Sequence, residues 1–433
     1  METKDTLFAA TQHSKQPQRK GLLRMLGPGL ITGAADDDPS GIATYSQSGA
    51  QFGYSLGWLM IISYPMMVIV QGISAGIGAV TGAGIAENLR RHYPPWILRL
   101  AVLMLLVANV FNIGADLAAM GAALELVIGG AHHLYALGFA TICVLLEIFV
   151  TYGNYVKVLR WLTLSLFAYV GVVFIVHLPW GTALSSLVVP TFSLDADFSM
   201  AMVAILGTTI SPYLFFWQAG EEMEELRRRN KKPLIETPTA ASRELKRIRM
   251  DTLIGMAISN LIALFIMFAT AATLHVNGIT KIESSSQAAE ALRPVAGDFA
   301  FLLFAAGIIG TGMLAVPVLA GSAAYAVSEM FRWREGLNQR PSKAKGFYGV
   351  IAAATLGGIA LTFTPLDPIR ALYWSAVING LLAAPLIALM VAIGMNRRIM
   401  GELRMPWWMA LGGGVTAVIM ASVAVVFFVV SGS

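Results

Sequence analysis

The stretch GAADDDPSGIATY, residues 33–45, places three consecutive aspartates, a proline and two glycines inside an otherwise apolar part of the chain. The whole protein has 433 residues, of which 56% are hydrophobic and only 13% are charged. An ordinary soluble domain carries about 25% charged residues. The composition therefore predicts an integral membrane protein, in which an ionised side chain at the bilayer centre costs roughly 2.5 to 3.5 kcal/mol on insertion scales.

Apolar runs long enough to cross the hydrocarbon core, roughly 20 residues each, predict eleven transmembrane helices. We therefore expect an all-α protein with a single transmembrane domain over residues 25–431, preceded by a flexible cytoplasmic tail over residues 1–24. The predicted helices lie near residues 25–50, 54–80, 97–126, 133–152, 156–177, 199–220, 250–275, 297–330, 347–364, 368–395 and 406–431.

The placement of Lys and Arg supports this number of helices, because basic residues accumulate in cytoplasmic loops. With the amino terminus in the cytoplasm, all but three of the 30 basic residues fall in inner segments, the exceptions being Lys281, Arg293 and Arg370. The positive charge thus indicates membrane topology and not nucleic-acid binding. We expect a multi-pass protein of the cell (inner) membrane, with the lipid bilayer as its partner and its carboxyl terminus outside.

Two predicted helices are interrupted in related ways, the first at residues 38–41 (Asp-Pro-Ser-Gly) and the sixth at residues 211–212 (Ser-Pro). Proline removes a backbone donor and disfavours helical geometry in the preceding residue. A single proline is usually a tolerated kink. If residues 25–177 and 199–395 are two repeats of opposite topology, however, both interruptions fall in the first helix of a repeat. That pattern points to a transporter with a binding site at the midplane, and the helix at 406–431 would then lie outside the repeat.

The interruptions predict an all-oxygen cation site. An unwound helix exposes carbonyl oxygens, and Asp38 is the carboxylate nearest the break. Asp36 and Asp37 are expected to shape the electric field or hold the hinge, because successive helical residues do not share a face. Hard oxygen ligands suit magnesium, calcium and manganese, and magnesium usually keeps several waters. The oxygen donors near the two breaks are Asp36, Asp37, Asp38, Ser40, Thr208, Thr209 and Ser211.

The chain resembles the natural resistance-associated macrophage proteins, the NRAMP family of divalent metal transporters. The likeness runs from about Gly27 to the tenth predicted helix and is clearest in GPGLITGAADDDPSGIATYSQSGAQFGY, QGISAGIGAVTGAGIAENLRRHYP, RIRMDTLIGMAISNLIA and LFAAGIIGTGMLAVPVLAGSAAYAVSEMF. The resemblance implies a LeuT-type inverted repeat of five plus five helices with discontinuous helices 1 and 6. It also implies proton-coupled uptake of manganese or iron, which bind between those two helices.

The chain departs from the family's motifs at three places. The first-helix motif Asp-Pro-Gly-Asn has Gly41 where the family has its asparagine ligand, and the sixth-helix motif Met-Pro-His reads Ser211-Pro212-Tyr213. The third-helix motif Asp-Leu-Ala-Glu keeps Asp116 but ends in alanine. Loss of the sulfur ligand and of groups tied to proton movement resembles the divergent NRAMP-related magnesium transporters, which move magnesium and manganese without proton coupling.

We therefore expect a carrier of divalent cations, Mg2+ before Mn2+, that works by alternating access without proton coupling; the cation is its substrate and no cofactor is expected. A proton-coupled manganese or iron transporter is the nearest alternative. The sequence leaves the oligomeric state open and is compatible with a monomer. The expected metal-site residues are Asp38, Gly41, Thr208 and Ser211, and the expected pathway residues are Asp36, Asp37, Ser40, Tyr213, Asp116 and Asn379.

Two of these polar residues have equally good structural explanations. Asn379 could form an interhelical hydrogen bond, and Asp116 could pair with a neighbouring helix instead of lining a path with Asn109 and Asn112. A sodium-coupled carrier of a small organic solute is a further alternative, since fold does not fix function. A carboxylate-bearing solute, however, would favour exposed N–H groups over three aspartates. A channel is disfavoured by the paired hinges, and an enzyme by the lack of a nucleophile or His-rich cluster.

Overall fold

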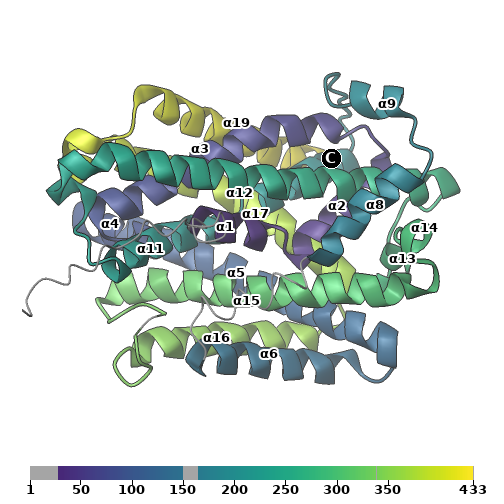
Figure 1. Ribbon diagram of the computed structural model, residues 1–433, viewed down its shortest axis with the longest axis horizontal. Helices are drawn as coiled ribbons and strands as arrows, with labels where there is room; N and C mark the ends of the chain where they lie inside the picture. Colours follow the sequence, from purple (N-terminus) through teal and green to yellow (C-terminus); the bar gives the residue numbers. More distant parts are fainter. Residues whose placement is uncertain (1–27, 150–163, 338, 433) are drawn as a thin grey trace, which may run out of the picture.

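The computed structural model describes residues 28–149, 164–337 and 339–432, and these residues form helices and connecting segments without a strand (Figure 1). The expected all-α membrane fold with two discontinuous helices is confirmed. The tail predicted over residues 1–24 and the first part of the helix predicted over 156–177 lie outside the described residues.

The helices follow one another through both halves of the chain. The first half contains α1 (Pro28–Asp36), α2 (Pro39–Phe52), α3 (Gly57–Thr81), α4 (Ile85–His92), α5 (Pro95–Ile128), α6 (His132–Phe149), α8 (Phe167–Ile175) and α9 (Trp180–Ser185). The second half contains α10 (Ala196–Thr209), α11 (Pro212–Arg228), α12 (Pro238–Thr273), α13 (Ser285–Glu290), α14 (Arg293–Ala296), α15 (Ala300–Phe331), α16 (Lys345–Thr362), α17 (Pro368–Met395), α18 (Arg397–Met400) and α19 (Trp407–Ser431).

In the described residues, nine segments are long and apolar enough to cross a membrane. They correspond to nine of the eleven predicted helices, with α10 and α11 forming one segment, Ala196–Arg228. The first predicted helix appears as the short helices α1 and α2, and the fifth is represented by the apolar segment Leu164–Ile175. The predicted order of membrane segments is therefore retained, with the first divided in two.

The helices begin where the sequence supplies capping chemistry. Asp38, Asp195 and Asp367 each cap a helix by accepting hydrogen bonds from backbone N–H groups in its first turn. Pro39 and Pro368 occupy the first helical position behind two of these caps, where a missing N–H costs nothing and the fixed φ angle suits a helix. Such caps explain how α2 can begin with only two residues between it and the end of α1.

The broken helices form the centre of the molecule. In Figure 1, α1 and α2 lie between α12 and α15, and the remaining helices surround them. The most apolar 18-residue window of segment Ala196–Arg228 is 89% buried inside the protein, whereas that of α6 or α19 is only 22% buried. Because outer helices expose their apolar side chains to lipid, α6 and α19 form the periphery and the polar breaks are kept inside.

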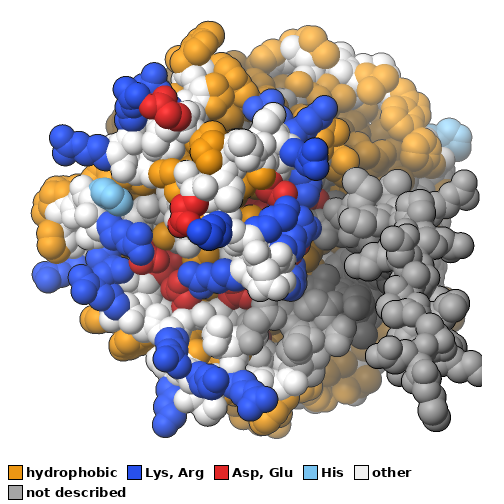
Figure 2. Space-filling view, turned by 60° about the vertical axis from the view of Figure 1, so that its left-hand side comes forward, with side chains coloured by type: hydrophobic (Ala, Val, Ile, Leu, Met, Phe, Trp, Pro, Cys, Tyr) orange, Lys and Arg blue, Asp and Glu red, His pale blue; other side chains and the backbone are white. Residues whose placement is uncertain are grey.

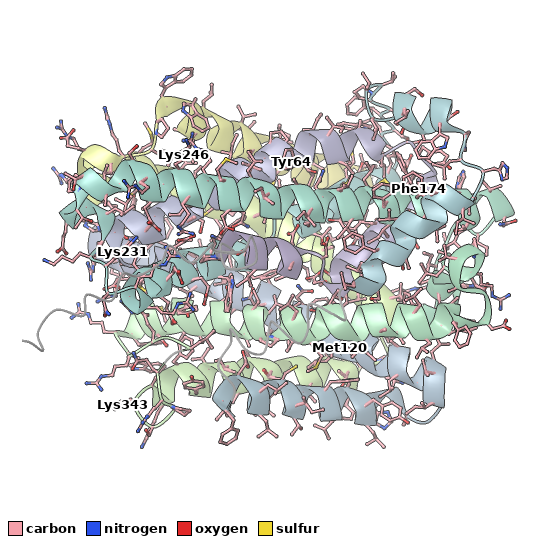
Figure 3. The ribbon with its side chains drawn as sticks, viewed as in Figure 1. Tyr64, Met120, Phe174, Lys231, Lys246 and Lys343 are labelled. Carbon is pink, nitrogen blue, oxygen red and sulfur yellow. The ribbon has the colours of Figure 1, made fainter. Side chains whose placement is uncertain are left out.

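One end of the molecule, here called the basic end, carries many Lys and Arg side chains, which gather around a few acidic groups in Figure 2. Figure 3 shows Lys231, Lys246 and Lys343 at this end, from the α11–α12 connection, α12 and the α15–α16 connection, and Phe174 of α8 toward the other end. Lys and Arg side chains therefore gather at this end of the molecule.

Candidate metal site

The first break lies at residues 37–38, between α1 and α2. Asp38 has extended backbone geometry, with φ −70° and ψ 170°, and caps α2. Its Oδ1 accepts hydrogen bonds from the Gly41 N–H and from the Ser40 hydroxyl, both at 2.7 Å. Its Oδ2 accepts from Asn112 Nδ2 at 3.2 Å and from the Tyr213 hydroxyl at 3.3 Å. Four neutral donors therefore hold one carboxylate at the break.

The second break lies at residues 210–211, between α10 and α11. Ser211 is extended, with φ −79° and ψ 129°, but its side chain does not cap α11. Its hydroxyl instead turns back to the end of α10, 2.9 Å from the carbonyl oxygen of Gly207 and 2.8 Å from that of Thr208. The oxygen atoms at this break are thus neutral and come from one side chain and the end of a helix.

The two breaks lie side by side. The Tyr213 hydroxyl, in the first turn of α11, lies 2.8 Å from the carbonyl oxygen of Ala35 as well as 3.3 Å from Asp38 Oδ2, so that its one proton is shared between them. A Cβ built on Gly41 would lie 3.2 Å from Thr208 Oγ1 and 3.4 Å from the carbonyl oxygen of Asp36. The structure therefore brings together Asp38, Gly41, Thr208 and Tyr213, from helices that are far apart in the sequence.

Asp36 and Asp37 face α12 and not the second break. The Ser259 hydroxyl of α12 lies 2.6 Å from Asp36 Oδ2 and 3.1 Å from Asp37 Oδ1. Backbones approach closely beside this contact, because a Cβ on Gly33 would lie 2.4 Å from the carbonyl oxygen of Gly255. These two aspartates therefore connect the end of α1 to α12, whereas Asp38 is directed toward α5 and α11.

Asp116 and Asn379 are buried near the breaks without partners. Neither carboxylate oxygen of Asp116 and neither amide atom of Asn379 has a hydrogen-bond partner in the described part of the chain. Asn379 precedes Gly380, whose backbone nitrogen lies 2.3 Å from where a Cβ on Gly207 would be. Because this contact is so close, Asn379 sits on α17 at the level of the end of α10. Buried polar groups without partners are uncommon in native proteins, and these two are free to contact a ligand or water.

The electrostatics of the site favour a cation. Within residues 28–149, 164–337 and 339–432, no Lys or Arg forms an ion pair with Asp36, Asp37 or Asp38, although all three are buried. In the same residues, no three His, Cys, Asp or Glu side chains converge as a ready metal cluster. Buried carboxylates without an opposite charge make this site electrostatically favourable for a cation.

The sequence predicts several of these residues but not others. Asn112 is predicted beside a hydrated path, whereas in the structure it donates a hydrogen bond to Asp38. Ser259 is not among the predicted residues. A signal existed, because Asp251, Gly255 and Ser259 recur every four residues and so form a polar and small face on a predicted apolar helix. All three contact α1: the Asp251 carboxylate accepts from the Gly29 N–H at 2.8 Å, and the other two meet Gly33 and the aspartates.

The chain is similar to known proteins over most of its length. The natural resistance-associated macrophage protein-like family matches residues 29–430. The divalent metal cation transporter MntH of Klebsiella pneumoniae strain 342 is 27% identical over 420 residues, covering 94% of each chain. MntH of Verminephrobacter eiseniae is 28% identical over 378 residues, covering 82% of this chain and 81% of the relative.

Solved structures share the fold at low identity. The Eremococcus coleocola manganese transporter, in complex with an aromatic bis-isothiourea substituted compound, superposes with a TM-score of 0.74 at 16% identity, covering 95% of this chain and 87% of that one. MhsT in complex with L-phenylalanine gives a TM-score of 0.58 at 13% identity. The family match spans nearly the whole chain, including both breaks, and we conclude that the protein belongs to the natural resistance-associated macrophage protein-like family.

Proposed function

We propose that the protein carries divalent metal cations across the membrane by alternating access, with the ion held between the two breaks. The observation that carries this proposal is the buried Asp38 carboxylate, which lies at one break and beside the other without a Lys or Arg partner in the described residues. A charge that is buried without an opposite charge is costly, and a cationic substrate removes that cost. The relatives named divalent metal cation transporters agree with this substrate class.

Magnesium and manganese are the proposed ions, with magnesium preferred. Residues 37–41 and 210–213 supply carboxylate, hydroxyl and carbonyl oxygens but no sulfur and no imidazole. Such a set of donors gives no advantage to soft or late transition metals. The side chains of Ser40 and Ser211 are small and Gly41 has none, so little side-chain bulk at the breaks opposes the water that magnesium retains.

The packing of the half-helices supports the proposed repeat of five plus five helices. A Cβ on Gly49 of α2 would lie 2.2 Å from a carbonyl oxygen of α12, and a Cβ on Gly78 of α3 would lie 2.1 Å from that of Ala219 in α11. Each broken helix thus packs closely on the helix that follows the other broken helix in the chain. Such an exchange is expected of two related halves packed around one site. We further propose that the basic end faces the cytoplasm.

Transport without proton coupling is the proposed mechanism, because Tyr213 and Ala119 stand where the family's motifs carry histidine and glutamate. A proton-coupled carrier is the second candidate. It is favoured by two carboxyl groups, Asp116 and Glu147, which are buried and have no hydrogen-bond partner in the described residues. Groups of this kind mark ion and proton pathways in membrane proteins. In the proton-coupled carrier these two carboxyl groups would carry protons, whereas in the uncoupled carrier they would not.

A reconstituted transport assay tests the proposal. Purified protein in liposomes should move Mg2+ and Mn2+, reported by a metal-sensitive dye, while a second dye in the lumen reports no acidification. Asp38→Ala should reduce metal flux to the level of empty liposomes. Asp195→Ala is the matched control, because it removes a helix-capping aspartate at the start of α10 and should leave flux unchanged. Both variants lose a cap worth about 1 kcal/mol, so a difference between them reports on the site.

Three outcomes separate the alternatives. Lumen acidification that follows metal flux and disappears in Asp116→Asn establishes the proton-coupled carrier. Uptake of a labelled organic solute with sodium, in the absence of any divalent flux, establishes the solute symporter. Metal flux that survives Asp38→Ala contradicts the site.

A further inference from the structure

A groove between α3, α12 and α19 lies outside the metal site. It has a volume of about 320 Å3, within the range of pockets that hold small ligands, roughly 300 to 1,000 Å3. Its walls are almost entirely apolar and include Ile69, Ile73, Leu253 and Met409. In Figure 1 these three helices run beside one another along one side of the molecule. The groove is therefore shaped for an apolar chain and not for an ion.

Gly76, which lines the groove, leaves space there because it has no side chain. A Cβ built on Gly76 of α3 would have no heavy atom within 4 Å, although this glycine lines the groove. Many glycines in these helices lie against another helix, as Gly78 does two residues further along α3, where a Cβ would lie 2.1 Å from a carbonyl oxygen. Gly76 therefore makes no helix contact that would explain it, and the space above it belongs to the groove.

Two arginines stand at the end of the groove that faces the basic end. Arg249 and Arg404 both line it and are exposed, and Arg249 lies over the ring of Trp408 with 5.2 Å to the ring centroid. Neither forms an ion pair in the part of the chain that the structure describes. Neighbouring arginines do pair: Arg247 meets Glu222 and Glu244. The arginines at the groove thus present positive charge to the surroundings, at the depth where Trp also marks a membrane interface.

A buried hydroxyl supplies an independent observation. Thr252 lines the groove between its apolar wall and its arginines, and is only 1% exposed. Its Oγ1 has no hydrogen-bond partner in the described residues. Most hydroxyls buried in these helices donate to a carbonyl of the preceding turn, as Thr270 does. The Thr252 hydroxyl is therefore an unsatisfied polar group in the wall of the groove, and rotation of this side chain would expose it to a polar atom of a molecule in the groove, such as an ester oxygen.

We propose that this groove binds one anionic phospholipid, with an acyl chain over Gly76, the ester region near Thr252 and the phosphate group between Arg249 and Arg404. A long apolar body with a single negative head matches a long apolar groove with two cations at one end. A free phosphate would use the arginines alone and leave the apolar walls and Thr252 without a role. The site is separate from the metal site, so the lipid is held whether or not the proposed transport function is correct.

Lipid retention measured by native mass spectrometry tests the proposal. The full-length protein in detergent is mixed with equal amounts of dioleoylphosphatidylglycerol and dioleoylphosphatidylcholine, and bound lipid is counted for each. The wild type should retain one phosphatidylglycerol molecule with a preference of roughly 30-fold, as expected for two arginines near an anionic head group. Inorganic phosphate added in excess should not displace it.

Two variants separate the apolar and charged parts of the site. Gly76→Leu should abolish retention of both lipids, because the new side chain fills the groove. Gly138→Leu on the peripheral helix α6 is the control, since a Cβ there also meets nothing within 4 Å, and it should leave retention unchanged. The exposed pair Arg249→Gln with Arg404→Gln should keep a bound lipid but reduce the preference to about one. Equal melting temperatures of the variants and the wild type establish that folding is intact.

Each contrary result would overturn the proposal. Equal retention of both lipids by the wild type would show that no charged site exists. Unchanged retention in Gly76→Leu would show that the lipid is held elsewhere on the surface. Displacement by inorganic phosphate would show that the arginines bind an anion without the groove.

Discussion

The break at residues 37–38 and the break at residues 210–211 lie side by side, but their chemistry differs. The first presents a carboxylate, Asp38, that also caps the helix after it. The second presents a hydroxyl, Ser211, that leaves the following helix uncapped and turns back to carbonyl oxygens. Two halves of one architecture therefore need not share chemistry. The charged break can define the sign of the substrate, while the neutral break can change without loss of charge.

The largest expected effect is the removal of the charge at the first break. Asp38→Asn keeps the size of the side chain and an oxygen that can cap α2, but it removes the charge that lies beside the second break. Metal flux should fall at least about 100-fold, the upper range seen when groups supporting a metal are lost. Ser211→Ala should reduce flux less than about 10-fold, because backbone carbonyls remain. Similar losses in both variants, measured in liposomes, would contradict the division of roles.

The close backbone contacts of the two breaks should be equally intolerant of a side chain. A Cβ on Gly33 would lie 2.4 Å from a carbonyl oxygen of α12, and one on Gly207 would lie 2.1 Å from the carbonyl oxygen of Ala376 in α17. Gly33→Ala and Gly207→Ala should each destabilise the protein by about 1 to 3 kcal/mol. Thermal unfolding in detergent measures this, and Gly138→Ala serves as the control. A lower melting temperature in only one of the two variants would show that one break is loosely packed.

Ser259 should matter only to the charged break. Ser259→Ala removes the hydroxyl shared by Asp36 and Asp37, and a hydrogen bond to a charged group contributes roughly 1.5 to 3 kcal/mol. We expect metal flux to fall about 10-fold, with the fold retained. Ser63→Ala is the matched control, because this buried serine bonds only neutral groups, Asn260 and a backbone carbonyl. An equal fall in the control would mean that both changes act through packing.

A smaller effect is expected on ion selectivity. The double variant Gly41→Asn with Ser211→Met adds an amide to the first break and a thioether to the second. The Cβ at residue 41 would contact Thr208 Oγ1 at 3.2 Å, so neighbouring atoms must shift by a few tenths of an ångström. Because thioether ligands favour softer metals, transport of manganese and cadmium should rise relative to magnesium. An unchanged order of ions in a competition assay would show that these residues do not contact the ion.

The smallest effect concerns the far end of α11, where Arg227 lies 3.8 Å from Glu335. Burial raises the pKa of Glu335 to about 7 despite the opposing effect of Arg227. The unfolded chain releases this proton near the ordinary pKa of 4.5, so folding stability falls as pH rises from about 4.5 to 7 and is level above that. Glu335→Gln should reduce the decrease in melting temperature between pH 5 and pH 8. The exposed control Glu402→Gln should leave the decrease unchanged.

Much of the fold could be predicted because membrane helices are recognisable in a sequence by their length and hydropathy. The interruptions at Pro39 and Pro212 were also visible, since proline acts through its own covalent structure. The sequence did not show which residues of different helices contact one another. Asp36 and Asp37 were expected near the hinge, but their bonds to Ser259 join segments more than 220 residues apart. Only the three-dimensional packing of α1 on α12 selects that serine from the others in the chain.

The candidate site was predicted in part for the same reason. Asp38 stood out because a carboxylate beside a helix break has few explanations. The donors to its second oxygen, Asn112 and Tyr213, come from α5 and α11, and no local pattern marks them as a pair. The position of Asn379 beside Gly207 likewise depends on two glycines in different helices, Gly207 and Gly380, allowing close approach. Sequence periodicity describes one helix at a time and cannot supply such pairings.

The four neutral donors around Asp38 affect how readily a bound cation can be released. Each hydrogen bond to the carboxylate is a competitor that an arriving dication must displace or share, and one that returns when the ion departs. A carboxylate without such competitors would bind a dication too tightly for repeated transport cycles. Movement across a membrane requires binding that is weak enough to reverse. If Asp38 binds the ion as proposed, Asn112, Tyr213, Ser40 and the Gly41 amide would limit its affinity and so favour its release.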